Sequence, residues 1–288
     1  DVGSVTNTIE YTGVKGKFNA DNYEIKKQEG TLTITKSRRL GLTVEDAEIK
    51  YNGKPLSAAK VEANVTEGTI ISYSIDDGKT WKAEAPSITN AGTLKVTVKA
   101  ENTNYETATS EYTLTITKRE VTLTSETAKK PYDGTPLTRP TVKVEGDGFV
   151  DGEVRDLRAT GTITYVGGPV TNTIEYTGVE SKFNADNYEI KKHEGTLTIT
   201  KAGKVGLTVE GAERKYNGEP LSAAKVEASE TEGTTISYSI DDGSTWTAEA
   251  PSITDAGTLK VTVKAENPNY KTATSEYTLT ITKREVTL

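Results

Sequence analysis

Two short stretches decide the fold: Thr-Leu-Thr-Ile-Thr at 113–117 and Leu-Lys-Val-Thr-Val-Lys at 94–99. Apolar and polar residues alternate in both, so Leu114 and Ile116 face one side of an extended strand while the threonines face the other. Short Asn-Gly, Asp-Gly and Gly-Thr turns separate such stretches, and no segment carries the 3.6-residue apolar stripe of a helix. The pattern predicts an all-β protein in which each sheet has one buried face and one solvent-exposed face.

The composition indicates several small cores instead of one large one. Only 33% of the 288 residues are hydrophobic, and the chain holds 25 Gly and 9 Pro. A net charge of −7 disfavours binding to a negatively charged phosphate backbone, so we expect no nucleic-acid partner. The absence of cysteine removes disulfides and thiolate chemistry. No apolar run approaches the roughly 18 residues that span a bilayer, so no membrane insertion is expected of this segment.

The chain contains an internal repeat. Residues 5–123 recur as residues 170–288 at a constant offset of 165, without insertion or deletion and with 18 differences. A weaker repeat lies within this period, because Tyr-Asn/Asp-Gly-x-Pro-Leu occurs at 51–56, 132–137 and 216–221. Asn-Tyr followed by Thr-Leu-Thr-Ile-Thr-Lys closes each unit, with Lys36, Lys118, Lys201 and Lys283 as the last residues.

These openings and closures predict five segments. They are the rear half of an A repeat (1–36), a B repeat (37–118), an A repeat (119–201), a second B repeat (202–283) and the first strand of a further A repeat (284–288). Each complete repeat has about 80 residues and roughly seven expected strands, which favours tandem immunoglobulin-like β-sandwiches over a barrel. A β-grasp-like fold is the alternative. The B-to-A junction lacks Gly and Pro, so we expect an extended rod of neighbouring repeats.

The incomplete first repeat, residues 1–36, is expected to be unstable by itself. A rear half of an A repeat exposes one apolar face and an unpaired strand edge, and an isolated hairpin is marginal in water. We therefore expect residues 1–36 either to pack on the following B repeat or to be completed by another chain. The second outcome would mean self-association through the incomplete terminal repeat and would make the chain a self-assembling extracellular fibre subunit.

The repeat motifs resemble those of a known family. The Tyr-Asp/Asn-Gly-x-Pro-Leu openings, the stretch Gly-Phe-Val-Asp-Gly-Glu at 148–153 and the closures resemble the bacterial Ig-like repeats of the MBG and YDG type. The resemblance covers essentially the whole chain. It implies stalk repeats of a surface adhesin of Gram-positive gut bacteria, outside the cell and anchored to the cell wall, with no catalytic residues to carry over.

One hairpin motif suggests a contact site. Ser-Ile-Asp-Asp-Gly-Lys-Thr-Trp at 74–81, and its copy at 239–246, match the "Asp box" of sialidase propellers, but the 165-residue spacing does not fit propeller blades. We interpret the motif as a structural turn in which Asp accepts backbone N–H bonds and Trp packs beneath it. An exposed aromatic pair is the alternative. The candidate ligand contacts are therefore Tyr73, Trp81, Tyr238 and Trp246.

No other motif favours chemistry. Asp76-Asp77 and Asp241-Asp242 do not follow a calcium-loop pattern, and solvated turns explain them. The single His193 stands where the earlier copy has Gln28, which argues against a catalytic histidine. We predict no enzyme activity, no catalytic residue, no metal and no cofactor. The sequence indicates structural stalk or spacer repeats of an adhesin that project a distal binding region, with a module for a host glycan or host protein as the alternative.

Overall fold

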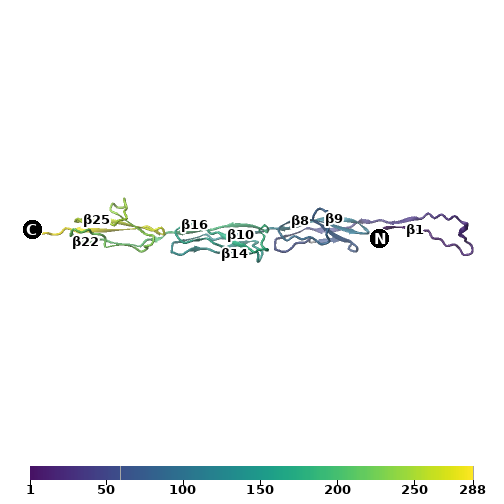
Figure 1. The fold of residues 1–288 in the computed structure, drawn as a ribbon, viewed down its shortest axis with the longest axis horizontal. Coiled ribbons are helices and arrows are strands. Elements are labelled where there is room, and N and C mark those ends of the chain that lie inside the picture. The colour runs from purple at the N-terminus through teal and green to yellow at the C-terminus, as the bar shows by residue number, and fades with distance from the viewer. Residues whose placement is uncertain (59, 288) are drawn as a thin grey trace. The chain divides into compact units, whose positions relative to one another are not determined.

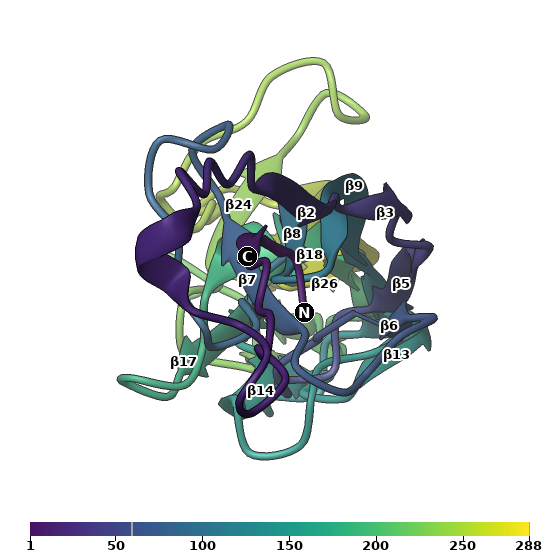
Figure 2. The ribbon, with the colours of Figure 1, turned by 90° about the vertical axis from the view of Figure 1, so that its right-hand side faces the viewer.

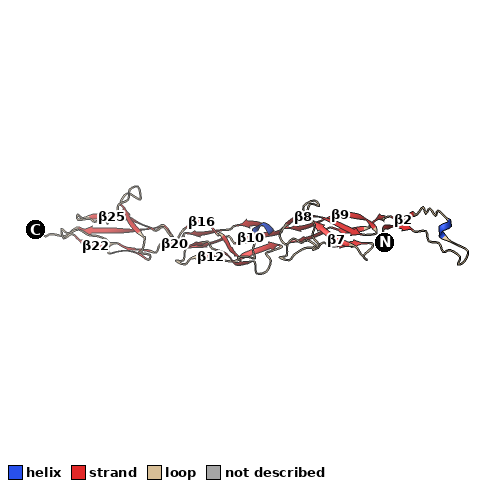
Figure 3. Cartoon of the chain, turned by 45° about the vertical axis from the view of Figure 1, so that its right-hand side comes forward, coloured by secondary structure: helices blue, strands red, loops and turns tan. Residues whose placement is uncertain are grey.

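The computed structural model describes residues 1–58 and 60–287, and Figure 1 labels its main strands along the chain. Strands alternate with turns, and two short 3-10 helices, η1 (Ala20–Asn22) and η2 (Ala185–Asn187), occur at equivalent places in the repeat (Figure 3). The all-β prediction is confirmed. The chain divides into two compact units, the first of which comprises Asp1–Val121, Gly146–Glu153 and Glu180–Glu189.

The first B repeat is a two-layer sandwich. One layer has the strand order β3-β9-β8-β7 with β5 parallel to β9, and the other is the antiparallel pair β4-β6. Figure 2 labels these strands except β4. The strands of the sandwich are β3 (Ser37–Arg39), β4 (Leu42–Glu45), β5 (Ala47–Lys50), β6 (Lys60–Ala63), β7 (Ile70–Ser74), β8 (Gly92–Asn102) and β9 (Tyr105–Thr117). This arrangement matches the predicted immunoglobulin-like sandwich, with seven strands among the described residues.

The alternation in β8 and β9 builds the core of this sandwich. Val96, Val98, Tyr112 and Leu114 are fully or almost fully buried, while the lysines and threonines between them face outward. Val98 lies opposite Ser110 and Val96 opposite Tyr112 in the antiparallel register, so the buried side chains of both strands point to one face. Apolar residues of β4 and β6 close that face, and their burial supplies the main driving force for folding.

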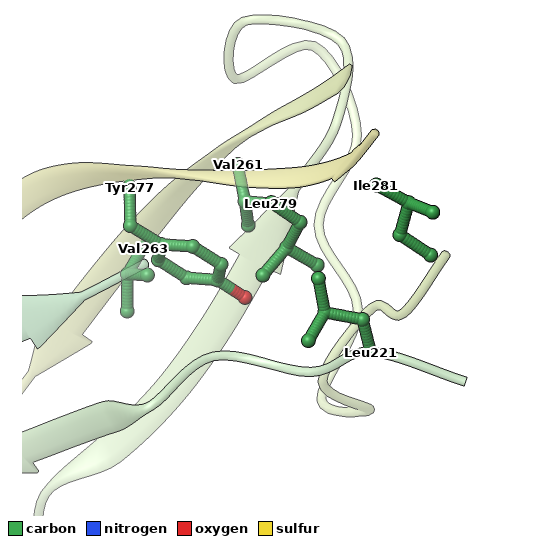
Figure 4. Packing of buried hydrophobic residues seen from close by; sticks show 6 residues of the cluster. All are labelled: Leu221, Val261, Val263, Tyr277, Leu279 and Ile281. Atoms are coloured by element: carbon green, nitrogen blue, oxygen red, sulfur yellow. The ribbon is translucent and has the colours of Figure 1, made fainter. Parts of the chain in front are cut away.

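The second B repeat has the same architecture. Figure 4 shows its core, in which Leu221, Val261, Val263, Tyr277, Leu279 and Ile281 pack together. Its strands are β20 (Ala202–Lys204), β21 (Leu207–Glu210), β22 (Ala212–Lys215), β23 (Lys225–Ala228), β24 (Thr235–Ser239), β25 (Gly257–Glu266), β26 (Tyr270–Lys271) and β27 (Ala273–Thr282). Similar sequence therefore gives similar local structure in the two B repeats, with β26 and β27 together in the place of β9.

The A repeat contributes to both compact units. Within the second unit, Leu137 packs against Leu197 and Ile199, and β11 pairs with β19 in parallel. Its strands are β10 (Arg119–Ser125), β11 (Ala128–Pro131), β12 (Leu137–Thr138), β13 (Val142–Gly146), β14 (Val154–Ala159), β15 (Thr162–Ile163), β16 (Gly167–Thr171), β17 (Ile174–Gly178), β18 (Tyr188–His193) and β19 (Thr196–Thr200). The two units do not follow the predicted repeat boundaries, which stay a prediction.

The rear half-repeat at residues 1–36 forms an antiparallel pair, β1 (Gly3–Asn7) with β2 (Gly30–Ile34). Every residue of both strands is exposed, including Leu32 at 56% and Ile34 at 63%. The predicted bare apolar face is present. The expected packing of these strands on the B repeat is not found among the described residues, since both strands are exposed over their whole length. One hydrogen bond to the B repeat runs from the Val2 N–H to Asn104 Oδ1 at 3.0 Å.

Candidate functional sites

The hairpin after β7 is a tightly hydrogen-bonded turn. Asp77 and Gly78 both have positive φ, 55° and 83°, which reverses the chain. The Asp76 carboxylate accepts hydrogen bonds from the Thr80 backbone N–H at 2.8 Å, from the Thr80 hydroxyl at 2.6 Å and from the Ser74 hydroxyl at 2.7 Å. The same set recurs around Asp241. The interpretation of the Asp box as a structural turn fits this geometry.

These hydrogen bonds explain the electrostatics of the two aspartates. Donation from Thr80, and then from Ser74, holds the pKa of Asp76 well below its usual range. The equivalent donors Thr245 and Ser239 lower the pKa of Asp241 to about 2. Both carboxylates are therefore ionised at neutral pH and already saturated by donors of their own turn. Within the described residues, no cluster of three or more His, Asp or Glu side chains is arranged to hold a metal ion.

Trp81 packs on the outer face of the sheet. Its ring lies under the Lys99 ammonium, with Nζ 4.6 Å from the ring centroid, and Lys264 lies 4.5 Å from the ring of Trp246. Both tryptophans are partly buried, as the hairpin motif led us to expect. Lys99 alternates with the buried Val98, so the cation–π pair lies on the face away from the core.

Tyr73 points to the opposite face. It lies across from Val98 in the β7–β8 register and packs against the core of the first B repeat. A recess of about 240 Å³ beside it is lined by Tyr73, Ile75, Thr80, Lys82, Glu84, Ala85, Pro86 and Ser87, and Trp81 is not among these residues. The copy beside Tyr238 likewise lacks Trp246. The structure therefore does not bring the predicted tyrosine and tryptophan contacts together in one groove.

A second candidate site joins the first B repeat to the A repeat, within the first compact unit. The buried Glu153 carboxylate accepts a hydrogen bond from the Tyr51 hydroxyl at 2.7 Å and another from the Tyr188 hydroxyl at 2.6 Å. The Tyr188 oxygen in turn accepts from the Val150 backbone N–H at 3.0 Å. A desolvated carboxylate is costly unless such donors satisfy it, so these two hydroxyls are required partners of Glu153.

The pKa values of the two tyrosines follow from this arrangement. Burial, together with the hydrogen bond to Glu153, raises the pKa of the Tyr51 hydroxyl. Burial and the bond to Glu153 also raise the pKa of the Tyr188 hydroxyl. Both groups therefore stay protonated well above neutral pH and keep donating to the carboxylate.

Cationic side chains surround the acidic loop that carries Glu153. The Arg119 guanidinium donates to the carbonyl oxygens of Tyr51, Gly148 and Asp147. The Lys50 ammonium forms an ion pair of 2.9 Å with the Asp147 carboxylate. Arg119 thus bridges the opening turn of the B repeat to the loop of the A repeat through three backbone acceptors.

Asn187 and four aromatic rings complete the contact. The buried Asn187 amide accepts from the Ala91 backbone N–H at 2.7 Å and donates to Asn90 Oδ1 at 3.1 Å. The Tyr188 ring lies edge-on to Tyr51 and within 5.3 to 5.6 Å of the rings of Phe149 and Phe183. Polar and apolar contacts therefore interlock the two repeats at this junction.

The junction between the A repeat and the second B repeat, within the second unit, is of another kind. The Tyr132 ring lies 5.6 Å from Tyr270 in an edge-on contact, and the Val166 N–H donates to Asn269 Oδ1 at 3.1 Å. Asn269 is held by its own N–H bond to Asn267. Among the described residues of this junction, no buried carboxylate lies between the repeats, so the two junction types differ in chemistry.

Sequence reasoning did not assign Glu153 a role. The stretch at 148–153 and the opening Tyr51 were both recognised as repeat motifs, but the two residues are 102 positions apart. One signal in the sequence could have suggested this contact. The A repeat has an acidic Asp-Gly-Glu loop, and the B repeat opens with Lys-Tyr, so the two motifs have opposite charges.

The comparisons with known proteins give no family. No family model matches the chain, and no curated protein matches it. Solved structures with similar chains include protocadherin gamma B2 extracellular cadherin domains 3–6 (TM-score 0.34, 10% identity, 85% of this chain and 73% of that chain). Another is the I9–I11 tandem from titin (TM-score 0.27, 13% identity, 85% of this chain and 100% of that chain). A third is a 1.5-MDa bacterial ice-binding adhesin (TM-score 0.30, 12% identity, 86% of this chain and 99% of that chain).

The structure contains no helix among its described residues that is long and apolar enough to cross a membrane.

Proposed function

We propose that this chain forms stalk or spacer repeats of a bacterial cell-surface adhesin, outside the cell and anchored to the cell wall. The observation that carries the proposal is the Glu153 contact, in which a buried carboxylate is shared by a tyrosine of each repeat. Such a contact fixes the approach of one repeat to the next, which is what a spacer requires. The resemblance of the motifs to MBG and YDG repeats supports the proposed location.

The residues of the junction suit a joint that resists bending. Tyr51 and Tyr188 cannot separate without leaving the Glu153 carboxylate short of a donor, and Arg119 would lose its carbonyl partners at the same time. Groups that act together in this way cost more to separate than isolated surface pairs, which contribute about 0 to 1 kcal/mol each. No single residue would perform the proposed function, since length and stiffness carry it.

Distance measurement across the junction tests the proposal. Because the chain has no cysteine, spin labels attach only at introduced positions, for example E62C in the first B repeat and K143C in the A repeat, both exposed. A stiff joint gives one narrow distance distribution by pulsed electron spin resonance, and E153Q broadens it. A broad distribution that E153Q leaves unchanged would contradict the spacer proposal.

A binding role is the second candidate, because the recess beside Tyr73 recurs beside Tyr238. Ile75 and Ile240 border these recesses and are exposed at 57% and 61%. A host glycan or protein would contact this edge. A glycan array probed with the intact chain separates the two ideas: a spacer gives background signal, while a binding module gives signal that I75S with I240S removes and W81A leaves.

A further inference from the structure

The second B repeat presents the same junction residues as the first, but without an A repeat upon them. Lys215, Tyr216, Gly218, Ala256 and Arg284 stand at the 165-residue offset from Lys50, Tyr51, Gly53, Ala91 and Arg119. Tyr51 is 3% exposed whereas Tyr216 is 41% exposed. The same side chain is therefore buried by a partner in one copy and left open in the other.

The backbone of the open surface matches that of the first junction at the tyrosine and at the turn that follows it. The Tyr216 N–H donates to Thr282 O at 2.9 Å, as the Tyr51 N–H does to Thr117 O. The following turns also agree, with φ of 77° at Gly53 and 83° at Gly218, and each turn is closed by an asparagine side chain that accepts a backbone N–H. A partner that fits the first surface meets nearly the same backbone at the second, so little reorganisation is required.

The shape and charge of the surface specify what fits it. A recess of about 630 Å³ is lined by Tyr216, Asn217, Gly218, Ala256, Lys283, Arg284 and Val286. Lys283 and Arg284 contribute positive charge to its lining and Lys215 lies next to Tyr216, while Glu219 and Asp255 stand where the first copy has Lys54 and Asn90. In the first copy the equivalent cations hold the acidic loop of residues 146–153, through Asp147 and the backbone carbonyls beside it.

We propose that the surface of Lys215, Tyr216, Gly218, Ala256 and Arg284 is a docking site for an A-type repeat. The site would receive an acidic loop of the Asp147 to Glu153 kind, whose glutamate accepts from the Tyr216 hydroxyl. An asparagine equivalent to Asn187 would accept from the Ala256 N–H, as Asn187 does from Ala91. The adjacent position changes from Asn90 to Asp255, and a carboxylate accepts the amide N–H of that asparagine equally well.

The inference rests on the proposed function, because it treats contacts between repeats as the working part of the chain. A chain extended after residue 288 by residues 124–201 tests it, since residues 284–288 already repeat residues 119–123. The readout is hydrogen exchange at the Ala256 amide. The Ala91 amide, which already has its Asn187 partner in the same molecule, is the internal reference.

The expected result is exchange at Ala256 that is slower by about tenfold or more in the extended chain, while exchange at Ala91 is unchanged. Asn187→Ala placed only in the added copy, or Tyr216→Phe, should return Ala256 toward its original rate. Unchanged exchange at Ala256 in the extended chain overturns the docking site. Protection that survives both substitutions also overturns it, because another surface would then carry the contact.

Failure of the docking site and failure of the spacer proposal give different results. If Ala256 stays unprotected while E153Q still broadens the distance distribution at the first junction, only the docking site is wrong. If the original chain instead protects Ala256 as its concentration rises, the half-repeat of a second molecule occupies the surface, and the proposed occupant is wrong.

Discussion

Residues 5–36 and 170–201 have almost the same sequence but opposite burial. They differ only at Lys15/Glu180, Gly16/Ser181 and Gln28/His193. Leu197 is completely buried and Tyr188 is 4% exposed, whereas their copies Leu32 and Tyr23 are 56% and 61% exposed. The local sequence forms a closing strand in both places, since β2 and β19 cover the same stretch of the repeat to within one residue. Residues 9–13 and 23–28, however, form no strand where their copies form β17 and β18. Burial instead depends on the front half of the A repeat, residues 119–165.

The front half supplies specific covering groups. Leu137 packs on Leu197 and Ile199, and Ala128 and Tyr132 lie against the same cluster. The parallel strand β11 pairs with β19 at Leu197. The same front half also carries Glu153, which organises the junction to the first B repeat. One segment therefore completes the core of its own repeat and joins that repeat to its neighbour.

The largest expected effect comes from completing the bare copy. In a chain with residues 119–165 repeated in front of Asp1, we expect amide exchange in β2 to slow by on the order of a thousandfold, because a marginal hairpin becomes part of a packed domain. Hydrogen exchange with mass spectrometry measures the change. The control carries Leu137→Asp in the added copy alone. Equal exchange in both chains would show that residues 119–165 do not determine burial.

Substituting the same leucine in both copies compares the stability that each copy loses. Leu197→Ala should destabilise the A repeat by about 2 to 5 kcal/mol, because a fully buried side chain leaves a cavity. Leu32→Ala should change stability by no more than about 0.5 kcal/mol, because Leu32 is exposed. Free energies from hydrogen exchange in β19 and β2 give both values. Similar losses at the two positions would mean that β2 has a cover in solution.

The two copies of the opening tyrosine should also differ. Tyr51→Phe removes one donor from the buried Glu153 carboxylate, which should cost about 1 to 3 kcal/mol. Tyr216→Phe removes a hydroxyl from an exposed side chain, so we expect a change within about 0.5 kcal/mol. Urea unfolding of the two variants compares them directly. A Tyr51→Phe chain as stable as the Tyr216→Phe chain would exclude a structural role for the hydrogen bond.

The smallest expected effect is the alkaline pH dependence. Burial and Glu153 raise the pKa of Tyr51 and Tyr188 above the ordinary value of about 10, so the folded state holds these protons more tightly than the unfolded state. Their contribution is therefore complete below about pH 10 and declines as the pH rises above it. Melting temperatures between pH 8 and 12 should fall less steeply in a Tyr51→Phe, Tyr188→Phe chain. The remaining slope includes Tyr112, whose pKa burial raises to about 12.

Much of the fold was predictable because it depends on near neighbours. The alternation at 94–99 and 113–117 placed Leu114 and Ile116 in the core, and both are buried. The Asp76 turn was also predictable, since the donors to its carboxylate lie within four residues. We expected the half-repeat either to pack on the B repeat or to be completed by another chain, and β1 and β2 are exposed over their whole length.

The junction was not predictable from spacing alone. Glu153, Tyr51 and Tyr188 come from three separate stretches, and only the folded loop of residues 146–153 brings them together. Sequence periodicity reports which face of a strand is buried, but it does not report which loops meet. Tyr73 and Trp81 lie on opposite faces of the sheet. Strand alternation could not predict this, because the turn between the two residues interrupts the alternation.

A double-mutant cycle between Tyr51 and Glu153 tests most directly whether their contact holds the B repeat to the A repeat. The free energy of unfolding is measured for the unaltered chain, Tyr51→Phe, Glu153→Gln and the double variant. A direct hydrogen bond predicts that the double variant loses less stability than the sum of the single losses, with a coupling of at least about 1 kcal/mol. Losses that add to within about 0.5 kcal/mol would contradict the account.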